Sequence, residues 1–190
     1  MANPIRPVTN SMTEKFFVDT NVLVYVYDVS QLTKSAVAVE WITRLWREQS
    51  GRTSVQVINE LHVTLTRKLP HRMDADEAWD VVSALVAWNP QPIDRELLLR
   101  AREVERRYQI SWWDSLIVAA AQLQDCDVLL TEDLQPGMNF GRVTVQNPFN
   151  LMVQEPRAAY SAADELPSRH RPRGRPRKQS RKQVGVVRPV

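Results

Sequence analysis

Cysteine, histidine and long apolar runs are scarce in this sequence of 190 residues, and each shortage removes a class of function. The single cysteine, Cys126, excludes an intramolecular disulfide and a thiolate-rich zinc site. The three histidines, His62, His71 and His170, are scattered, which argues against histidine-based metal chemistry. No apolar stretch reaches the ~18 residues that a membrane span needs. The chemistry of this chain is therefore expected to depend on carboxylates.

Charge is unevenly distributed along the chain, although the formal net charge is only +3. Residues 155–190 contain ten Lys and Arg against three Asp and Glu, whereas residues 1–154 contain fifteen against nineteen. We therefore expect three segments: a lead over 1–14, an acidic domain over 15–154, and a basic tail over 155–190 that is disordered in isolation. The N-terminus lacks the basic-then-apolar pattern of a signal peptide, so the expected location is the cytoplasm.

Short apolar runs alternate with amphipathic segments through the acidic domain. Strands are expected at 16–18, 52–55, 127–130 and 142–145. Helices are expected at about 35–49 and 56–68, after the capping residues Asp74 and Asp94, and at 115–123. This alternation predicts the fold class α/β, with a parallel twisted sheet and helices on both faces.

Four acidic residues lie at positions where α/β folds commonly bind ligands. Asp19 and Asp133 follow expected strands, and two more acids, Glu60 and Asp114, lie near expected helix starts. Ligands bind beyond the carboxyl ends of parallel strands, so these side chains are expected to converge. Each acid also has an ordinary structural explanation, as a helix cap, a solvated helix residue, a capping-box partner of Ser111 or a turn residue.

The four acids taken together favour a metal site. Two carboxylates about 5 Å apart repel by roughly 3 kcal/mol at an effective dielectric of about 20, so a group of four needs neutralisation. An all-oxygen set of ligands suits Mg²⁺ or Mn²⁺. Haloacid-dehalogenase-like phosphatases and response-regulator receivers also combine carboxylates with Mg²⁺, but both need a downstream Lys, and none occurs between Lys68 and Lys178. Glycine-rich phosphate loops and Gly-x-Ser-x-Gly motifs are also absent from the sequence.

Four segments resemble the PIN-domain ribonucleases, and they are Phe17-Val-Asp-Thr-Asn-Val-Leu-Val, Asn59-Glu60-Leu, Trp113-Asp-Ser-Leu-Ile-Val-Ala-Ala-Ala and Leu129-Leu-Thr-Glu-Asp-Leu-Gln. They follow the family's order over residues 16–149, and the most similar subgroup looks like the VapC toxins of bacterial toxin–antitoxin pairs. The resemblance implies a PIN-like three-layer fold. It assigns the catalytic and metal-binding acids of the family to Asp19, Glu60, Asp114 and Asp133, and supporting polar positions to Asn21 and Thr131.

Two positions test this resemblance. Gln124-Asp125-Cys126 stands where relatives often have a Gly before the strand, which should affect the turn and not the chemistry. Glu132 beside Asp133 makes the fourth acid ambiguous, and Asp133 is preferred because it matches the family's Thr-x-Asp.

The resemblance implies a metal-dependent endoribonuclease that hydrolyses RNA phosphodiesters. It further implies the toxin of a type II pair, a homodimer and a cognate antitoxin partner. An alternative is a nucleic-acid-binding regulator that uses the PIN-like body for dimerisation and the basic tail for DNA. A structure-specific DNA nuclease is disfavoured, because nothing indicates the helical arch or clamp of such enzymes. Trp112 and Trp113 beside Asp114 would stack on unpaired bases or simply pack.

The tail contains Arg171-Pro-Arg-Gly-Arg-Pro-Arg-Lys178, which looks like an AT-hook. In that reading Arg173, Gly174 and Arg175 lie in the narrow, negative minor groove of A·T-rich DNA. The alternative is a solvated basic tail that binds any polyanion, RNA included, through counterion release. The sequence leaves both open.

Overall fold

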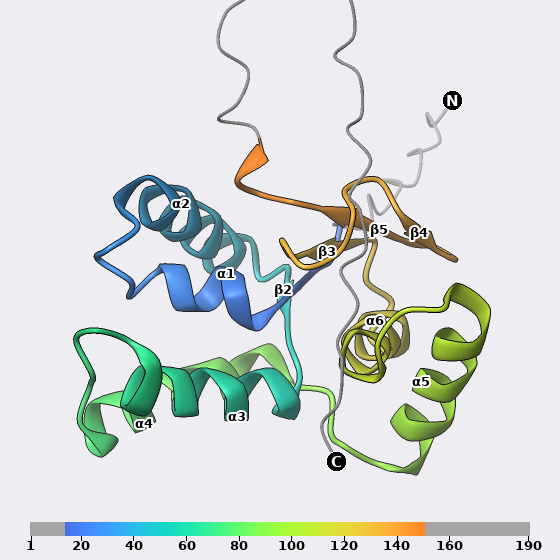
Figure 1. Cartoon of the computed structure of the whole chain (residues 1–190), viewed down its shortest axis with the longest axis horizontal. Coiled ribbons are helices and arrows are strands. Elements are labelled where there is room, and N and C mark those ends of the chain that lie inside the picture. Colours follow the sequence, from blue (N-terminus) through green and yellow to red (C-terminus); the bar gives the residue numbers. More distant parts are fainter. Residues whose placement is uncertain (1–13, 151–190) are drawn as a thin grey trace, which may run out of the picture. The chain divides into compact units, whose positions relative to one another are not determined.

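The protein is described by a computed structural model over residues 14–150 (Figure 1). The expected lead over 1–14 therefore falls outside the described residues except for its last position. The expected basic tail, with Arg173, Gly174 and Arg175, lies wholly outside them.

Five strands form one sheet in the order β2-β1-β3-β5-β4. The strands are β1 (Phe16–Val18), β2 (Gly51–Arg52), β3 (Val128–Leu130), β4 (Asn139–Phe140) and β5 (Val143–Gln146). The pairs β1–β2, β1–β3 and β3–β5 are parallel, whereas β4 pairs antiparallel with β5. The carboxyl ends of the four parallel strands therefore meet at one edge of the sheet.

Six α-helices surround this sheet within residues 14–150 (Figure 1). They are α1 (Thr20–Tyr25), α2 (Leu32–Glu48), α3 (Val55–Val63), α4 (Ala75–Ala84), α5 (Arg95–Tyr108) and α6 (Trp112–Leu123). A π-helical turn, η1 (Thr64–Lys68), extends α3, and a 3₁₀ turn, η2 (Leu85–Trp88), extends α4. The predicted α/β fold with a mostly parallel sheet and helices is confirmed.

The helix starts are set by local hydrogen bonds that the sequence already indicated. Asp74 and Glu77 form a reciprocal capping box at α4. Asp94 caps α5 by accepting from the Leu97 amide, and Ser111 caps α6 by accepting from the Asp114 amide. Each cap satisfies an amide that would otherwise lack a partner in the first turn.

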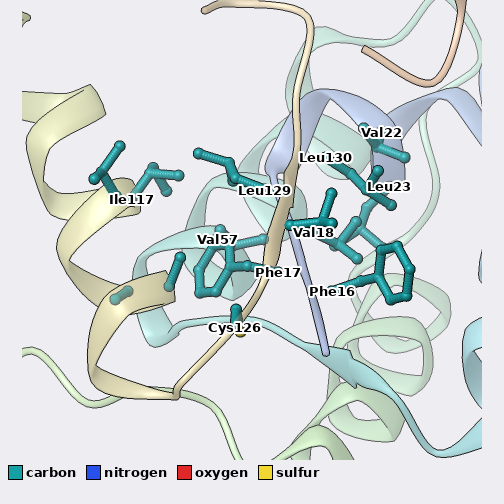
Figure 2. Close-up of a cluster of buried hydrophobic side chains, with 14 of the residues drawn as sticks. Phe16, Phe17, Val18, Val22, Leu23, Val57, Ile117, Cys126, Leu129 and Leu130 are labelled. Atoms are coloured by element: carbon teal, nitrogen blue, oxygen red, sulfur yellow. The ribbon is translucent and has the colours of Figure 1, made fainter. Parts of the chain in front are cut away.

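The central strands are buried on both faces, which explains their uninterrupted apolar sequence. In Figure 2, Phe17 and Leu129, which are paired in register, extend towards the helix that carries Ile117. Phe16 extends to the other side, where its ring lies 5.5 Å from that of Trp41 on α2. Because successive side chains of a strand point to opposite faces of the sheet, the short strand β1 packs against helices on both faces.

Two details differ from the expected elements. The strand expected at 52–55 is only Gly51–Arg52, because Ser54 leaves the sheet to cap α3. The β4 strand was not expected, since two residues carry no detectable alternation. In the turn before β3, Asp125 adopts the left-handed conformation that favours glycine, with φ 54°. Within residues 14–150, no helix is both long and apolar enough to cross a bilayer.

Candidate active site

Asp19 lies directly after β1, at the edge where the parallel strands end. Its side chain is only 8% exposed. The Oδ1 atom accepts from the backbone amide of Thr20 at 2.7 Å, and Oδ2 accepts from the hydroxyl of Thr131 at 2.7 Å. Asp19 is thus the N-cap of α1, as the ordinary explanation proposed, and is also held by a residue that follows β3.

Asn21 connects the acids at the ends of β1 and β3. Its Nδ2 lies 3.2 Å from Oδ2 of Asp19, 3.0 Å from Oδ2 of Asp133 and 3.1 Å from the Thr131 hydroxyl. One amide has two protons, so it satisfies at most two of these three acceptors at a time. The Oδ1 atom of Asn21 is buried and has no hydrogen-bond partner within the described structure.

Glu60 reaches the same neighbourhood from α3. Its Oε2 accepts from the Thr20 hydroxyl at 2.9 Å, and its Oε1 accepts from Nε2 of Gln56, one turn earlier, at 3.1 Å. Thr20 therefore holds Glu60 next to Asp19. Neither Thr20 nor Gln56 was among the site residues predicted from the sequence. The i, i+4 spacing of Gln56 and Glu60 was a usable signal for the second contact, whereas nothing local indicated the first.

The pKa of the Asp19 carboxyl is raised from 3.8 to about 7, and burial is the largest cause. The negative charges of Asp133 and Glu60 contribute to this rise, while hydrogen bonds from the Thr131 hydroxyl and the Thr20 amide oppose it. Within residues 14–150, no Lys or Arg side chain forms an ion pair with Asp19. A cation placed beside Asp19 would lower the pKa of this carboxyl.

Asp114 stands apart from the other three acids in the described hydrogen-bond network. Its Oδ2 accepts from the Ser111 hydroxyl at 2.7 Å in the first turn of α6. The other end of α6 lies where β1 begins, because the Gln124 carbonyl oxygen is 3.4 Å from Nζ of Lys15. The first turn of α6, with Asp114, therefore points towards the edge where the strands end.

The two neighbouring acids Glu132 and Asp133 have opposite surroundings. Glu132 forms an ion pair with Lys34 at 2.5 Å and accepts from the Tyr25 hydroxyl at 2.6 Å. Asp133 instead approaches Asn21, and its own amide donates to the Thr131 hydroxyl at 3.1 Å. The structure thus pairs Glu132 with Lys34 and places Asp133 near Asp19 through Asn21, and the choice of Asp133 as the fourth acid stays a prediction.

The residues around Asp19 fit a divalent cation by their chemistry. They offer carboxylate oxygens and the unpartnered Oδ1 of Asn21, and Mg²⁺ is typically bound by one or two carboxylates with water completing its shell. Within residues 14–150, no three acidic, histidine or cysteine side chains are close enough to surround one ion together. The fit is therefore to an ion held by two carboxylates, with the remaining positions open to water or phosphate.

Cys126 is buried, whereas Trp112 and Trp113, which precede Asp114, are exposed to different degrees. Cys126 is fully buried, and burial raises the pKa of its thiol to about 12, so it is a core residue as expected. Trp112 is 36% exposed and Trp113 is 64% exposed. Simple packing therefore does not account for Trp113, and its stacking on bases stays a prediction.

The fold and the position of these side chains define the class: an α/β protein with a carboxylate-lined edge on a mostly parallel sheet. The sequence profile of the PIN domain family matches residues 16–143. The chain belongs to the PIN domain family, and the predicted resemblance is confirmed.

Two solved structures are similar to this chain. A toxin–antitoxin complex from Klebsiella pneumoniae has a TM-score of 0.53 at 18% identity, covering 70% of this chain and 98% of its own. The toxin VapC20 of Mycobacterium tuberculosis, described as cleaving the sarcin–ricin loop, has a TM-score of 0.46 at 19% identity, covering 63% and 92%. At these identities the first similarity is one of fold. No curated protein matches the sequence.

Proposed function

We propose that this PIN domain protein is a metal-dependent endoribonuclease and the toxin of a type II toxin–antitoxin pair. The observation that carries the proposal is the buried Asp19, which shares Asn21 with Asp133 and has no ion-pair partner within residues 14–150. The PIN domain match over residues 16–143 and a fold similar to that of a chain in a toxin–antitoxin complex support the proposal.

The position of each acid suggests its role in hydrolysis. Asp19, once deprotonated, and Asp133 would hold Mg²⁺ or Mn²⁺. Asn21 lies within hydrogen-bond distance of both carboxylates, and Thr131 donates to that of Asp19. Glu60, held by Thr20, and Asp114, in the first turn of α6, would hold or orient a second ion or its water. When bound, the metal lowers the pKa of a water molecule and offsets charge on the phosphoryl oxygens. No histidine or thiolate is required.

The direct test uses purified protein and a fluorescently labelled structured RNA. Cleavage is expected with Mg²⁺ or Mn²⁺ and is expected to stop in EDTA and return when excess metal is restored, because the charge needed at the phosphate comes from the ion. Cleavage that continues undiminished in EDTA would contradict the metal-dependent mechanism. Product ends mapped by sequencing identify whether the cuts are internal.

The pair Glu132 and Asp133 supplies a matched comparison of neighbouring acids. Asp133→Asn is expected to lower the cleavage rate by about 10²-fold or more, since it removes a carboxylate from the ion. Glu132→Gln is expected to leave the rate within about threefold, because this acid is paired with Lys34 and Tyr25. Initial rates at saturating Mg²⁺ are the measurement. Equal losses in the two variants would show that the fourth acid is misassigned.

The antitoxin is proposed to neutralise the same carboxylates. An Arg guanidinium binds carboxylates bidentately and would compete with metal for Asp19 and Asp133. Native mass spectrometry of the co-expressed neighbouring reading frames is expected to show a homodimer with bound antitoxin. The addition of antitoxin is expected to abolish cleavage. A monomer that no neighbouring product binds would rule out this partner scheme.

A further inference from the structure

The segment that follows β3 carries two adjacent acids, Glu132 and Asp133, and only Asp133 is assigned to the proposed metal site. Neighbouring Cα atoms lie about 3.8 Å apart across a trans peptide bond, so the two side chains leave the backbone close together. Neither residue forms a backbone–backbone hydrogen bond with another described residue. The directions of the two carboxylates therefore depend on the contacts of their side chains.

Two side chains from different helices hold the Glu132 carboxylate. The hydroxyl of Tyr25, the last residue of α1, donates to Oε1 of Glu132 at 2.6 Å. Nζ of Lys34, in the first turn of α2, donates to Oε2 of Glu132 at 2.5 Å and to the Tyr25 hydroxyl at 2.8 Å. Both oxygens of Glu132 are thus engaged on the side of α1 and α2, and hydrogen bonds to a charged group are among the stronger ones.

The ammonium group of Lys34 is also held by two aromatic rings. Nζ lies 4.4 Å from the centroid of the Tyr25 ring and 5.3 Å from that of the Phe149 ring, distances at which an aromatic face attracts a cation. The two rings pack edge to face with centroids 5.0 Å apart, and Phe149 is buried. The cation that pairs with Glu132 therefore has a fixed place between α1, α2 and the segment after β5.

The pair of Lys34 and Glu132 is neutral as a whole, and each partner alone would act on a nearby metal ion in the opposite sense. An unpaired Glu132 would attract a divalent ion and offer it a third carboxylate, whereas an unpaired Lys34 would repel the ion. Within residues 14–150, no three acidic, histidine or cysteine side chains surround one position. Glu132, although adjacent to Asp133 in the chain, is thus excluded from the set of acids around Asp19.

We propose that Lys34 is a positioning residue that holds Glu132 away from the proposed metal site, so that Asp19 and Asp133 alone bind the first ion. The inference rests on the proposed function, because it takes these two carboxylates as the ligands. Lys34 contacts neither the ion nor RNA in this role and acts only through Glu132. Without Lys34, the freed carboxylate draws the ion away from the position at which it assists cleavage, and misplaced groups lose catalytic rate.

Mn²⁺ binding to the full-length protein tests this role without RNA, by isothermal titration calorimetry at fixed pH and ionic strength. Lys34→Met is expected to raise the Mn²⁺ affinity about fivefold, and Glu132→Gln to lower it about fivefold, because one unit of charge beside the ion changes sign between them. The double variant, Lys34→Met with Glu132→Gln, is expected to bind within about twofold of the wild type. A pair that only stabilised the fold would move both single variants in the same direction.

Cleavage rates at saturating Mn²⁺ test whether the tighter binding is unproductive. Lys34→Met is expected to cleave RNA about tenfold more slowly than the wild type although it binds Mn²⁺ more tightly. The double variant is expected to recover to within about threefold of the wild type, because the competing carboxylate is gone. Lys34→Arg keeps the positive charge and the hydrogen-bond donors, and it is expected to recover most of the rate.

A second ion pair on the same helix supplies the matched control. Arg44 pairs with Glu48 at 3.0 Å near the other end of α2, and its guanidinium lies 5.6 Å from the ring of Phe16, the first residue of β1. This pair is therefore at the edge of the sheet opposite Asp19. Arg44→Met is expected to bind Mn²⁺ and cleave RNA as the wild type does. Thermal melts check that every variant folds.

The outcomes separate this inference from the proposed function. Opposite changes of Mn²⁺ affinity in the two single variants, together with recovery in the double variant, support the role of Lys34. Weaker binding in both single variants, or a double variant that behaves as Lys34→Met does, overturns it. If the wild type binds Mn²⁺ but does not cleave RNA, the proposed function fails, while the Mn²⁺ affinities still decide the role of Lys34. A wild type that does not bind millimolar Mn²⁺ overturns both.

Discussion

Asp19→Asn is expected to lower the rate of metal-dependent RNA cleavage by about 10³-fold or more while the protein stays folded. The metal supplies several kcal/mol of charge stabilisation in phosphoryl transfer, and each 1.36 kcal/mol is a factor of ten in rate. Asp19 is the most buried of the four acids and the one on which Thr20, Asn21 and Thr131 converge. Initial cleavage rates and a circular dichroism spectrum are the measurements.

The same substitution is expected to stabilise the metal-free protein above pH 7. Asp19 has a folded-state pKa of about 7 and an ordinary value of 3.8, so the folded protein retains a proton that the unfolded chain releases between these two values. The wild type therefore loses stability as the pH rises from about 4 to 7, by up to about 4 kcal/mol. Asn carries no charge and removes this penalty, although it accepts fewer hydrogen bonds.

Chemical denaturation at two pH values checks the stability effect. In EDTA, the free energy of unfolding of the wild type is expected to be lower at pH 8 than at pH 5, and the difference between the two pH values is expected to shrink in Asp19→Asn. Asp127→Asn is the control, because Asp127 has a lowered pKa from the Lys15 amide and Arg142 at the far edge of the sheet. A variant that cleaves RNA normally, or one less stable than the wild type at pH 8, would refute the account of Asp19.

Binding of Mn²⁺ is expected to be strongly pH-dependent. An ion held by Asp19 would need the charged carboxylate, so below pH 7 each bound ion would displace a proton, and the affinity is expected to fall about tenfold per pH unit. Isothermal titration calorimetry in buffers of different ionisation enthalpy measures both the affinity and the protons released. About one proton per ion is expected well below pH 7, and none well above it.

Two variants separate Asp19 from other titrating groups in the Mn²⁺ experiment. Asp19→Asn is expected to bind weakly with little pH dependence, while Asp127→Asn is expected to follow the wild type. An affinity for Mn²⁺ that is flat between about pH 5.5 and 8 in the wild type would show that Asp19 is not a ligand.

The fold was predictable to the extent that its signals were local. The apolar run of β1 and the caps at Asp74, Asp94 and Ser111 are determined by residues within one turn of one another. The β4 strand was missed because two residues show no period, and its pairing with β5 depends on the turn at Gly141, where φ is 72°. Such strand pairing depends on tertiary contacts, which the local sequence pattern does not reveal.

The candidate site, like the fold, was only partly predictable from the sequence. The four acids and their order could be identified from the sequence, but their hydrogen-bond partners could not. Asn21 and Asp133 are 112 positions apart, and Thr20 and Glu60 are 40 positions apart. The orientation of Glu132 towards Lys34 depends on the backbone direction after β3. Sequence identifies which groups are present, and tertiary packing decides which of them share a site.

The two outer strands, β2 and β4, are each only two residues long, and this affects how the protein can associate with copies of itself. An exposed strand edge recruits other chains through its free amide and carbonyl groups, and very short edge strands are one of the ways in which natural proteins suppress such pairing. The sheet of this protein therefore offers little template for edge-to-edge aggregation. Any ordered self-association would therefore use the helices, where Trp79 and Val86 are among the exposed apolar side chains.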